Sequence, residues 1–338
     1  MSKRRGLFAA AALACALCAA GARAEDGFYA GRTLTLVIGY GVNTGYDIYC
    51  RIVARHISKY LPGQPNVVVQ NMPGAASLTA MGYLYNTAPR DGTYLGMIDQ
   101  AVALTQLISP RGFRADVAKF NWIGRVTDNA AILFGWHAAA VQKIEDAYQK
   151  TLIVAANGQN SRMMSALLKN LLGLKLNIVT GYPSSADSVL AMQRGEVDAT
   201  TMPWSVLRSE RAGWIKDKQI NLLLQIGTES HAGLEQVPVV TSLARNDEER
   251  QILELMSRDS RVGRSFMSPP GEPPERVADL RKAFMETVKD PDFLDEIHRG
   301  NLDLVPMAGD DLQKLMEQAM EVSPELVQKA VNLTKSED

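Results

Sequence analysis

The feature that most constrains the fold of this chain is a regular alternation of short apolar runs with amphipathic helical segments. Apolar runs at residues 33–38, 66–69 and 94–98 predict strands. The two segments between them have helical periodicity, the first after Asp47 and the second at about 75–85. Strands that alternate with helices form parallel sheets covered by helices. The first third of the chain therefore predicts an α/β unit.

The same pattern then restarts. Further strands are predicted at 131–136, 152–156, 177–179, 197–200 and 222–226, with helices at about 163–171 and 184–194. The tail predicts a strand at 265–267, a helix opened by Pro273 and Pro274, a short helix after Pro291, a strand at 302–305 and a final helix capped by Asp310. We therefore expect two α/β units in series, with a tail that returns to the first.

The N-terminus has the three parts of a secretory signal peptide. Lys3, Arg4 and Arg5 form a basic region, residues 6–20 are apolar, and Ala22-Arg23-Ala24 is a small-residue cleavage motif. We expect cleavage after Ala24 and export to the periplasm. A lipoprotein signal that ends at Cys15 is the alternative, and it would leave a shorter apolar region.

Removal of the signal changes the charge and the cysteine content. Residues 1–24 contain four basic and no acidic side chains, so the formal net charge falls from −1 to about −5. A mildly acidic exported protein is not expected to bind nucleic acid. Cys50 remains as the only cysteine, which predicts a buried thiol and no internal disulfide.

The sequence gives no positive sign of catalysis or of a bound cofactor. Gly39, Gly41 and Gly45 are spaced one residue too widely for a dinucleotide fingerprint, and no Lys-Ser or Lys-Thr pair follows them as in a P-loop. The four histidines lack metal-ligand spacing. We find no G-x-S-x-G elbow and no S-x-x-K motif. We therefore predict a binding protein without cofactor or metal rather than an enzyme.

Polar loops between strands and helices are the candidate binding site. The carboxyl ends of parallel strands share one sheet edge, where ligands bind, and helix N-termini there favour anions. The alternative is that these polar residues are only helix caps and turn formers. The candidate ligand-binding residues are Tyr40, Asn43, Thr44, Gly45, Asp47, Ala75, Ala76, Ser77, Asn157, Gln159, Asn160, Ser161, Tyr182 and Ser184.

Several of these segments also resemble a known family. The stretches 70-QNMPGAASLTA-80, 88-APRDGTYL-95 and 182-YPSSADSVLAMQRGEVDA-199 are similar to motifs of the tripartite tricarboxylate transporter receptors, the TctC-like or Bug family. The resemblance covers essentially the whole mature chain. It implies an α/β, type II periplasmic binding protein, a "Venus flytrap" in which each lobe is a mostly parallel sheet flanked by helices. Residues 26–124 and 260–338 would form one lobe and 125–259 the other, with two chain crossings.

The resemblance also implies a function. The protein would be a monomer that captures a small carboxylic acid between its lobes and delivers it to membrane permease subunits. The loop 39-GYGVNTGYD-47 differs from the family's usual P-F-x-P-G-G-x-x-D: Tyr40 fits the aromatic position and Asp47 the final acid, but Asn43 and Thr44 replace the double glycine. Two other interpretations stay open: a secreted α/β enzyme that acts on a small acid, and a ligand-sensing co-receptor of the same fold.

Overall fold

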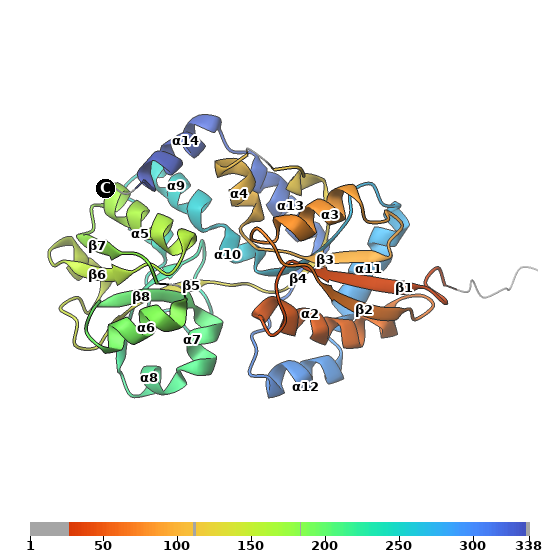
Figure 1. Ribbon diagram of the computed structural model, residues 1–338, viewed down its shortest axis with the longest axis horizontal. Coiled ribbons are helices and arrows are strands. Elements are labelled where there is room, and N and C mark those ends of the chain that lie inside the picture. Colours follow the sequence, from red (N-terminus) through yellow and green to blue (C-terminus); the bar gives the residue numbers. More distant parts are fainter. Residues whose placement is uncertain (1–26, 111–112, 183, 336–338) are drawn as a thin grey trace, which may run out of the picture.

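The computed structural model describes residues 27–110, 113–182 and 184–335, and it contains two β-sheets, each flanked by helices (Figure 1). We call the body built around the first sheet the first lobe and the body built around the second sheet the second lobe. The two lobes lie side by side along the long axis of the molecule (Figure 1). This confirms the predicted two-lobed α/β fold, but both sheets are mixed and not mostly parallel as the resemblance implied, because each of them also contains strands that pair antiparallel with their neighbours. The predicted signal peptide lies outside the described residues.

The first lobe contains a six-stranded mixed sheet in the order β11-β4-β10-β3-β1-β2. Its strand β1 is parallel to β2 and β3, whereas β10 runs antiparallel to β3 and β4, and β11 antiparallel to β4. The strands are β1 (Thr33–Ile38), β2 (Asn66–Asn71), β3 (Tyr94–Met97), β4 (Asn121–Thr127), β10 (Arg264–Ser268) and β11 (Met307–Ala308). The helices of this part are α2 (Gly45–His56), α3 (Leu78–Asn86), α4 (Val102–Ile108), α11 (Pro274–Thr287), α12 (Pro291–Arg299) and α13 (Gly309–Met320).

The second lobe contains a five-stranded mixed sheet in the order β7-β6-β8-β5-β9. Here β6 is parallel to β7 and β8, and β5 runs antiparallel to β8 and β9. The strands are β5 (Ala131–Trp136), β6 (Leu152–Ala155), β7 (Leu176–Val179), β8 (Ala199–Pro203) and β9 (Ile220–Ile226). The helices are α5 (Gln159–Leu172), α6 (Ser185–Gln193), α7 (Trp204–Glu210), α8 (Ala212–Lys216), α9 (Asp247–Ser257), α10 (Asp259–Val262) and α14 (Pro324–Leu333).

The helix periodicity explains how the cores are filled. In α2 the fully buried Cys50 and Val53 face the first sheet beside Leu36 and Ile38 of β1. Burial raises the pKa of the Cys50 thiol well above its usual range, so this cysteine is packed as a small apolar side chain, as predicted. In α5 the buried Leu167 packs with Val154 of β6 in the second lobe. Each lobe therefore has its own hydrophobic core.

The structure corrects three predicted elements. No strand is formed at residues 302–305, where the Val305 N–H donates to the carbonyl of Val126 (3.0 Å) without continuous ladder pairing, and the pairing strand is β11. The N-cap of α13 is Ala308, and Asp310 lies in the first turn, where it pairs with Arg281. Helix α3 begins at Leu78 and not near residue 75, because the three residues before it have positive φ.

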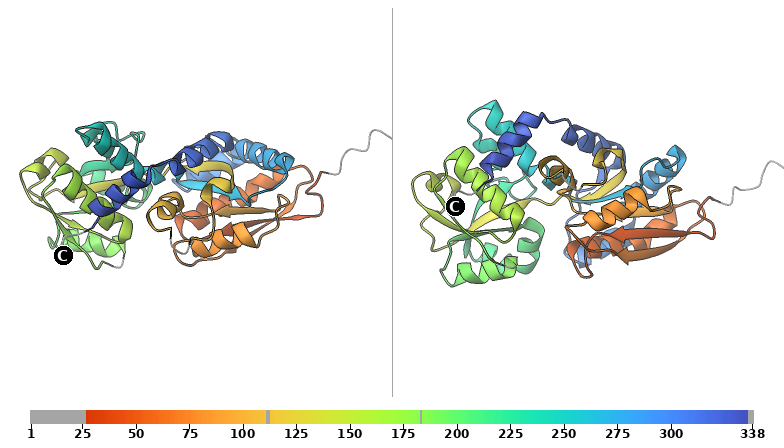
Figure 2. Two further views of the ribbon diagram at one scale, coloured as in Figure 1. Left: turned by 90° about the horizontal axis from the view of Figure 1, so that it is seen from above. Right: turned by 45° about the horizontal axis from the view of Figure 1, so that its top comes forward.

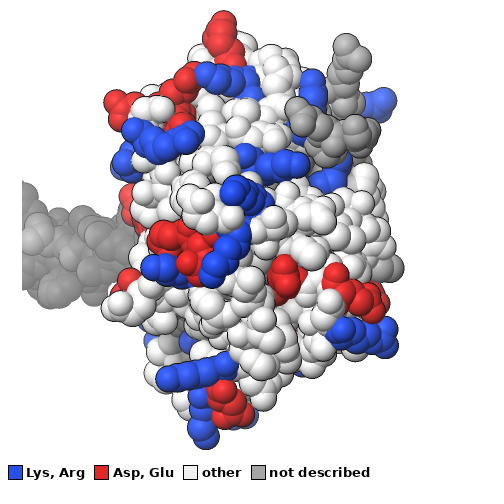
Figure 3. Space-filling view, turned by 90° about the vertical axis from the view of Figure 1, so that its left-hand side faces the viewer, with Lys and Arg blue, Asp and Glu red and all other residues white. Residues whose placement is uncertain are grey.

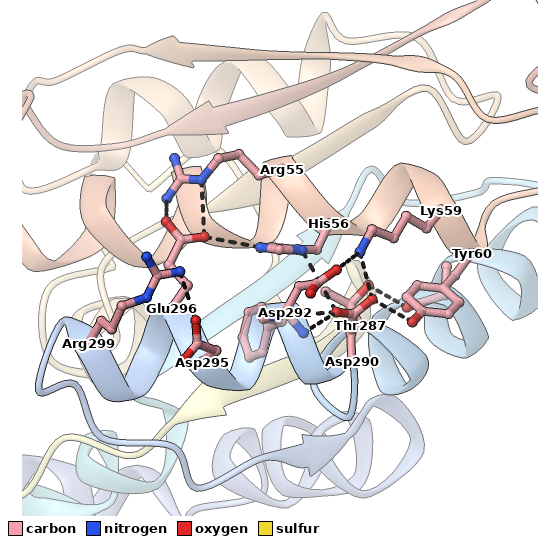
Figure 4. Close-up of polar contacts among 12 residues, drawn as sticks. Arg55, His56, Lys59, Tyr60, Thr287, Asp290, Asp292, Asp295, Glu296 and Arg299 are labelled. Carbon is pink, nitrogen blue, oxygen red and sulfur yellow. Dashed lines mark hydrogen bonds and ion pairs between the residues drawn. The ribbon is translucent and has the colours of Figure 1, made fainter.

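A network of charged residues fastens α12 to α2 and the short segment that follows α2 (Figure 4). Asp290 caps α12 and accepts hydrogen bonds from the Tyr60 hydroxyl (2.7 Å) and the Lys59 ammonium (3.0 Å). These contacts, led by the Tyr60 hydroxyl, hold the pKa of Asp290 well below its usual range. Glu296, on the next turns of α12, contacts Nε2 of His56 (3.0 Å) and the Arg55 guanidinium. The network fixes α12 and hence the segment between α12 and β11.

The chain passes between the lobes three times. It crosses between β4 and β5, between α10 and β10, and again between α13 and α14. Helix α14 packs against α5 and α9 of the second lobe and also against α4, and Figure 2 shows the C-terminal helices passing from one lobe to the other. The predicted lobe boundaries at residues 125 and 260 stay a prediction, and the third crossing adds to the two that the family resemblance implied.

The hydropathy of the described helices and the charge of one surface bear on contacts with membranes and nucleic acids. The helices of the described residues do not meet the length and hydropathy that a membrane-spanning helix requires. On the end of the molecule formed by the second lobe, Lys and Arg side chains are interspersed with Asp and Glu (Figure 3). A surface of mixed charge on this face gives no single-signed patch of the kind that binds a nucleic-acid backbone.

Candidate functional site

A cavity of about 200 Å³ lies between the two lobes, and we call it the interlobe cavity. It is lined from the first lobe by residues that follow β3, from the crossing segments, and from the second lobe by the start of α5 and the end of β8. The lining residues are Gln100, Leu104, Asn129, Ala131, Asn157, Asn160, Ser161, Met163, Met164, Thr201, Met202, Pro203, Ile226, Met256 and Asp259. Three of the predicted site residues, Asn157, Asn160 and Ser161, are brought together here.

The second-lobe wall is built on the loop between β6 and α5. Asn157 donates hydrogen bonds from Nδ2 to Oγ of Ser188 and to the carbonyl of Thr201, each at 3.2 Å. The hydroxyls of Ser161 and Thr201 are 2.8 Å apart, which holds the first turn of α5 against β8. Asn160 is exposed and makes no such contact among the described residues. Its side chain is therefore free to contact a ligand.

The N-terminus of α5 offers hydrogen-bond donors to this cavity. Its N-cap is Gly158, at φ 131°, a conformation that glycine adopts without strain, and no side chain caps the helix. The first turn also contains no acidic residue. The free N–H groups of a helix start, together with the helix dipole, favour an anion. This is the part of the cavity best suited to a negatively charged group.

Gln100 joins the first lobe to the cavity. Its Oε1 accepts hydrogen bonds from Nδ2 of Asn129 (2.7 Å) and Nη1 of Arg264 (3.2 Å), and its backbone N–H donates to the Tyr46 hydroxyl (3.0 Å). The sequence prediction missed Gln100, Asn129, Thr201 and Asp259, all of which line the cavity. For Gln100 a signal was present, because it comes two residues after the predicted strand 94–98 and so lies at the carboxyl edge of the sheet.

Tyr40 lies behind the cavity wall and does not line it. Its ring stacks on Tyr46 with 4.5 Å between centroids, and its hydroxyl donates to Asp99. Burial, followed by the charge of Asp99, raises the pKa of Tyr40 well above its usual range. The Arg264 guanidinium covers the other ring, 3.9 Å from the Tyr46 centroid. Tyr40 therefore supports the segment that carries Gln100.

The rest of the loop after β1 forms the start of α2. Thr44 is the N-cap, and its hydroxyl accepts from the Asp47 N–H (3.3 Å). The buried Asp47 carboxylate accepts from Arg51 Nε and from the Asn43 N–H, each at 2.9 Å, so Asp47 holds the loop from the third helical position and is not the cap itself. The hydrogen bond from Arg51 is the main cause that lowers the pKa of Asp47 to about 2.

None of the four predicted residues from Asn43 to Asp47 lines the interlobe cavity. Asn43 and Asp47 instead border a groove between α2 and α12. Gly45 is the first residue of α2, and a Cβ added there would lie 3.5 Å from Nη2 of Arg264, which is ordinary contact. The structure places these residues beside the first-lobe wall, and a contact with ligand stays a prediction.

The loop after β2 contains the predicted residues Ala75, Ala76 and Ser77. All three have positive φ, at 46°, 49° and 72°, which is rare for residues with a side chain. The Ser77 hydroxyl is buried and donates to the carbonyl of Gly39 (3.2 Å), so it ties this loop to the one after β1. Ala75 and Ala76 are exposed. The loop lies beside the β1 loop but contributes no residue to the interlobe cavity.

Three second-lobe candidates also lie outside the cavity. The Gln159 amide turns along α5 to the sulfur of Met163 (3.6 Å). Tyr182 packs against a cluster of buried side chains in the second lobe. Ser184 is the N-cap of α6, and its hydroxyl accepts from the Asp187 N–H (3.3 Å). This is the helix-capping role that was the alternative to ligand binding for such polar residues. For Tyr182 and Ser184 a role as ligand contact stays a prediction, whereas for Gln159 we now expect no contact with a ligand in the interlobe cavity.

The chemistry of the cavity suits binding. Among the described residues that line it there is no lysine, arginine, histidine or cysteine, and Asp259 is the one ionisable side chain. In the described part of the chain, no group of three or more His, Cys, Asp or Glu side chains is placed to hold a metal ion. The lining therefore combines amide and hydroxyl groups with the apolar side chains of several methionines.

Comparison with known proteins agrees with the fold. A family model described as the tripartite tricarboxylate transporter family receptor, TctC, matches residues 49–333. The UPF0065 protein in the gbd 5' region of Cupriavidus necator is 25% identical over 316 residues, covering 88% of each chain. The crystal structure of a TctC solute-binding protein from Polaromonas, without ligand, has a TM-score of 0.69 at 20% identity and covers 89% of this chain and 99% of its own.

Two further similar structures come from Rhodopseudomonas palustris. One, with adipate, has a TM-score of 0.62 at 18% identity and covers 89% of this chain and 97% of its own. The other, MatC with bound malate, has a TM-score of 0.58 at 16% identity and covers 90% and 99%. At these identities the structures support the fold, and the family match supports membership. The chain belongs to the TctC family of tripartite tricarboxylate transporter receptors, which are periplasmic solute-binding proteins.

Proposed function

We propose that this protein captures a small carboxylate in the interlobe cavity and delivers it to the membrane permease subunits of a tripartite tricarboxylate-type transporter. The observation that carries the proposal is the uncapped N-terminus of α5, which opens into the cavity beside Asn157 and Asn160. A carboxylate there would accept hydrogen bonds from the backbone and from neutral side chains. The adipate and malate bound by the two Rhodopseudomonas proteins support this ligand class.

The size of the cavity fits a metabolite. At about 200 Å³ it is smaller than the roughly 300–1,000 Å³ typical of sites for drug-sized ligands. Export by cleavage after Ala24 and action as a monomer belong to the same proposal. The ligand is expected to leave the protein chemically unchanged, because the cavity lining offers no pairing of a nucleophile with a base.

A screen of mono-, di- and tricarboxylates tests the proposal. We expect at least one acid to raise the melting temperature. At ~100 times its dissociation constant a ligand adds about 2.7 kcal/mol to the free energy of unfolding. NMR spectra of the acid after prolonged incubation with the protein should be unchanged. Stabilisation only by neutral sugars or by cations, or conversion of the acid, would overturn the proposal.

Delivery to a permease needs its own measurement. Proteoliposomes that contain candidate permease subunits should accumulate the bound acid only when this protein is added on the outer side. Uptake at the same rate without the protein would contradict the delivery step, and the binding step would then be judged by the screen alone.

A further inference from the structure

One charged side chain in the interlobe cavity has no counterion. Asp259 is the first residue of α10, at the crossing from the second lobe back to the first, and it is half-buried. Among the described residues, no Lys, Arg or His forms an ion pair with its carboxylate, which accepts hydrogen bonds from the Gln100 side chain and from the backbone N–H groups of Asp259 and Ser260, and Asp99 adds a second negative charge nearby. An unpaired acid that is partly removed from water is costly.

The arginines close to Asp259 in the sequence are engaged elsewhere. Arg258 donates from Nη1 to the carbonyl of Ala319 (2.6 Å). Arg261 pairs with Glu229 at 3.6 Å. Arg264 stacks on Tyr46 and donates to Gln100. A cationic partner for Asp259 is therefore not supplied by its own segment, which gives the carboxylate backbone N–H donors only, and a bound molecule can supply one.

In the interlobe cavity, Asp259 and the polar groups at the start of α5 lie on different sides. Asp259, Gln100 and Leu104 also line a second cavity of about 320 Å³ beside the crossing segments, whereas Asn157, Asn160 and Ser161 line only the interlobe cavity. Asp259 thus lies where the two cavities adjoin, and the N-terminus of α5 lies at the other part of the wall. The lining presents donors at the α5 side and an acceptor at the Asp259 side.

We infer that Asp259 selects among carboxylates, and that the preferred ligand carries, besides the acid group held at the α5 end, a hydrogen-bond donor, an ammonium or a hydroxyl group, that reaches Asp259. This inference rests on the proposed function. A plain carboxylate would satisfy the α5 end but bring a second negative charge near Asp259. A donor substituent would instead donate a hydrogen bond to the Asp259 carboxylate, and an ammonium group would also supply the counterion that the protein does not provide. Burial and the nearby charge of Asp99 raise the pKa of Asp259 to about 6, as expected for a carboxylate without a cation.

Matched acids test the inference by calorimetric titration at pH 7.5. Succinate, malate and aspartate differ only in one substituent, and adipate, 2-hydroxyadipate and 2-aminoadipate form a second series. In at least one series the wild-type protein should bind a donor-bearing acid at least about tenfold more tightly than the plain acid, since a hydrogen bond to a charged group is worth about 1.5–3 kcal/mol. In Asp259→Asn the preference should fall to within about threefold, with a melting temperature that is unchanged or higher because a costly charge has been removed.

The control is Glu254→Gln, because Glu254 lines the second cavity but not the interlobe cavity. It should keep the wild-type preference. If wild-type protein binds the plain acids as tightly as the substituted ones, or if Asp259→Asn keeps the full preference, the inference about Asp259 is wrong while carboxylate capture stands. If no carboxylate binds to wild-type protein, the proposed function and this inference fail together.

Discussion

Two neighbouring residues at the start of α5 have opposite expected roles. Asn160 lines the interlobe cavity, whereas the Gln159 amide contacts Met163. Asn160→Ala should weaken carboxylate binding by about 0.5–1.5 kcal/mol for a neutral contact, or ~1.5–3 kcal/mol if it contacts the charged group. Gln159→Ala should bind as wild type. Both sites are in the first turn of one helix, so a difference in calorimetric affinity reflects the ligand and not the helix.

The opposite pattern of affinities would place the ligand-binding site elsewhere. Loss of affinity in Gln159→Ala with full affinity in Asn160→Ala would show that the ligand lies on the outer side of α5, near the C-terminal residues that Gln159 faces.

Among the elements, the loop before α3 is expected to be strained. Ala76 has φ 49°, and a left-handed residue with a side chain costs about 1–2 kcal/mol, whereas glycine adopts this conformation freely. Ala76→Gly should leave the free energy of unfolding unchanged or raise it by about 1 kcal/mol, after the greater entropy of the unfolded glycine is subtracted. Denaturant titration of the two proteins measures the difference.

The matched control lies in the helix that follows. Ala80 is fully buried within α3, so Ala80→Gly should lower the free energy of unfolding by about 1 kcal/mol. If Ala76→Gly is as destabilising as Ala80→Gly, the positive φ values before α3 carry no strain.

The elements were more predictable from sequence than the site. Strands β1 and β5 agree with the predicted ranges residue for residue, because alternating apolar runs are local patterns. Periodicity does not give partners, so the antiparallel return of β10 between β3 and β4 could not be foreseen. The cavity depends on that return, since it brings Asp259 beside Gln100, residues far apart in the sequence. The polarity of the loops therefore identified Asn157 and Asn160 but did not identify Gln100 and Asp259.

At the scale of the whole molecule, one ion pair connects the lobes at the side away from α14. Arg208 of α7 contacts the carboxylate of Asp303, which lies between α12 and β11. The Asp303 side chain is buried, while that of Arg208 is 40% exposed. Such a pair is worth about 1 kcal/mol or less, enough to shift a balance between open and closed lobes several-fold. Figure 1 shows α7 and α12 facing each other on this side.

Reversing the charges should change the spacing of the lobes. We expect Arg208→Asp to increase the radius of gyration of the ligand-free protein in small-angle scattering, and the double variant Arg208→Asp with Asp303→Arg to restore it. Arg211→Asp is the control, because Arg211 contacts Trp214 of its own lobe. A radius that stays the same in Arg208→Asp would show that the pair does not hold the lobes together.

Because of the third crossing, the two ends of the described chain lie on different lobes. The chain enters the first lobe just before β1 and ends after α14, which is packed on the second lobe, at the other end of the long axis (Figure 1). A closing motion of the lobes around a ligand would therefore change the separation of the ends themselves. A donor fluorophore fused at one end and an acceptor at the other would turn the mature protein into an optical sensor for its ligand, with no cysteine introduced and Cys50 left undisturbed in its core.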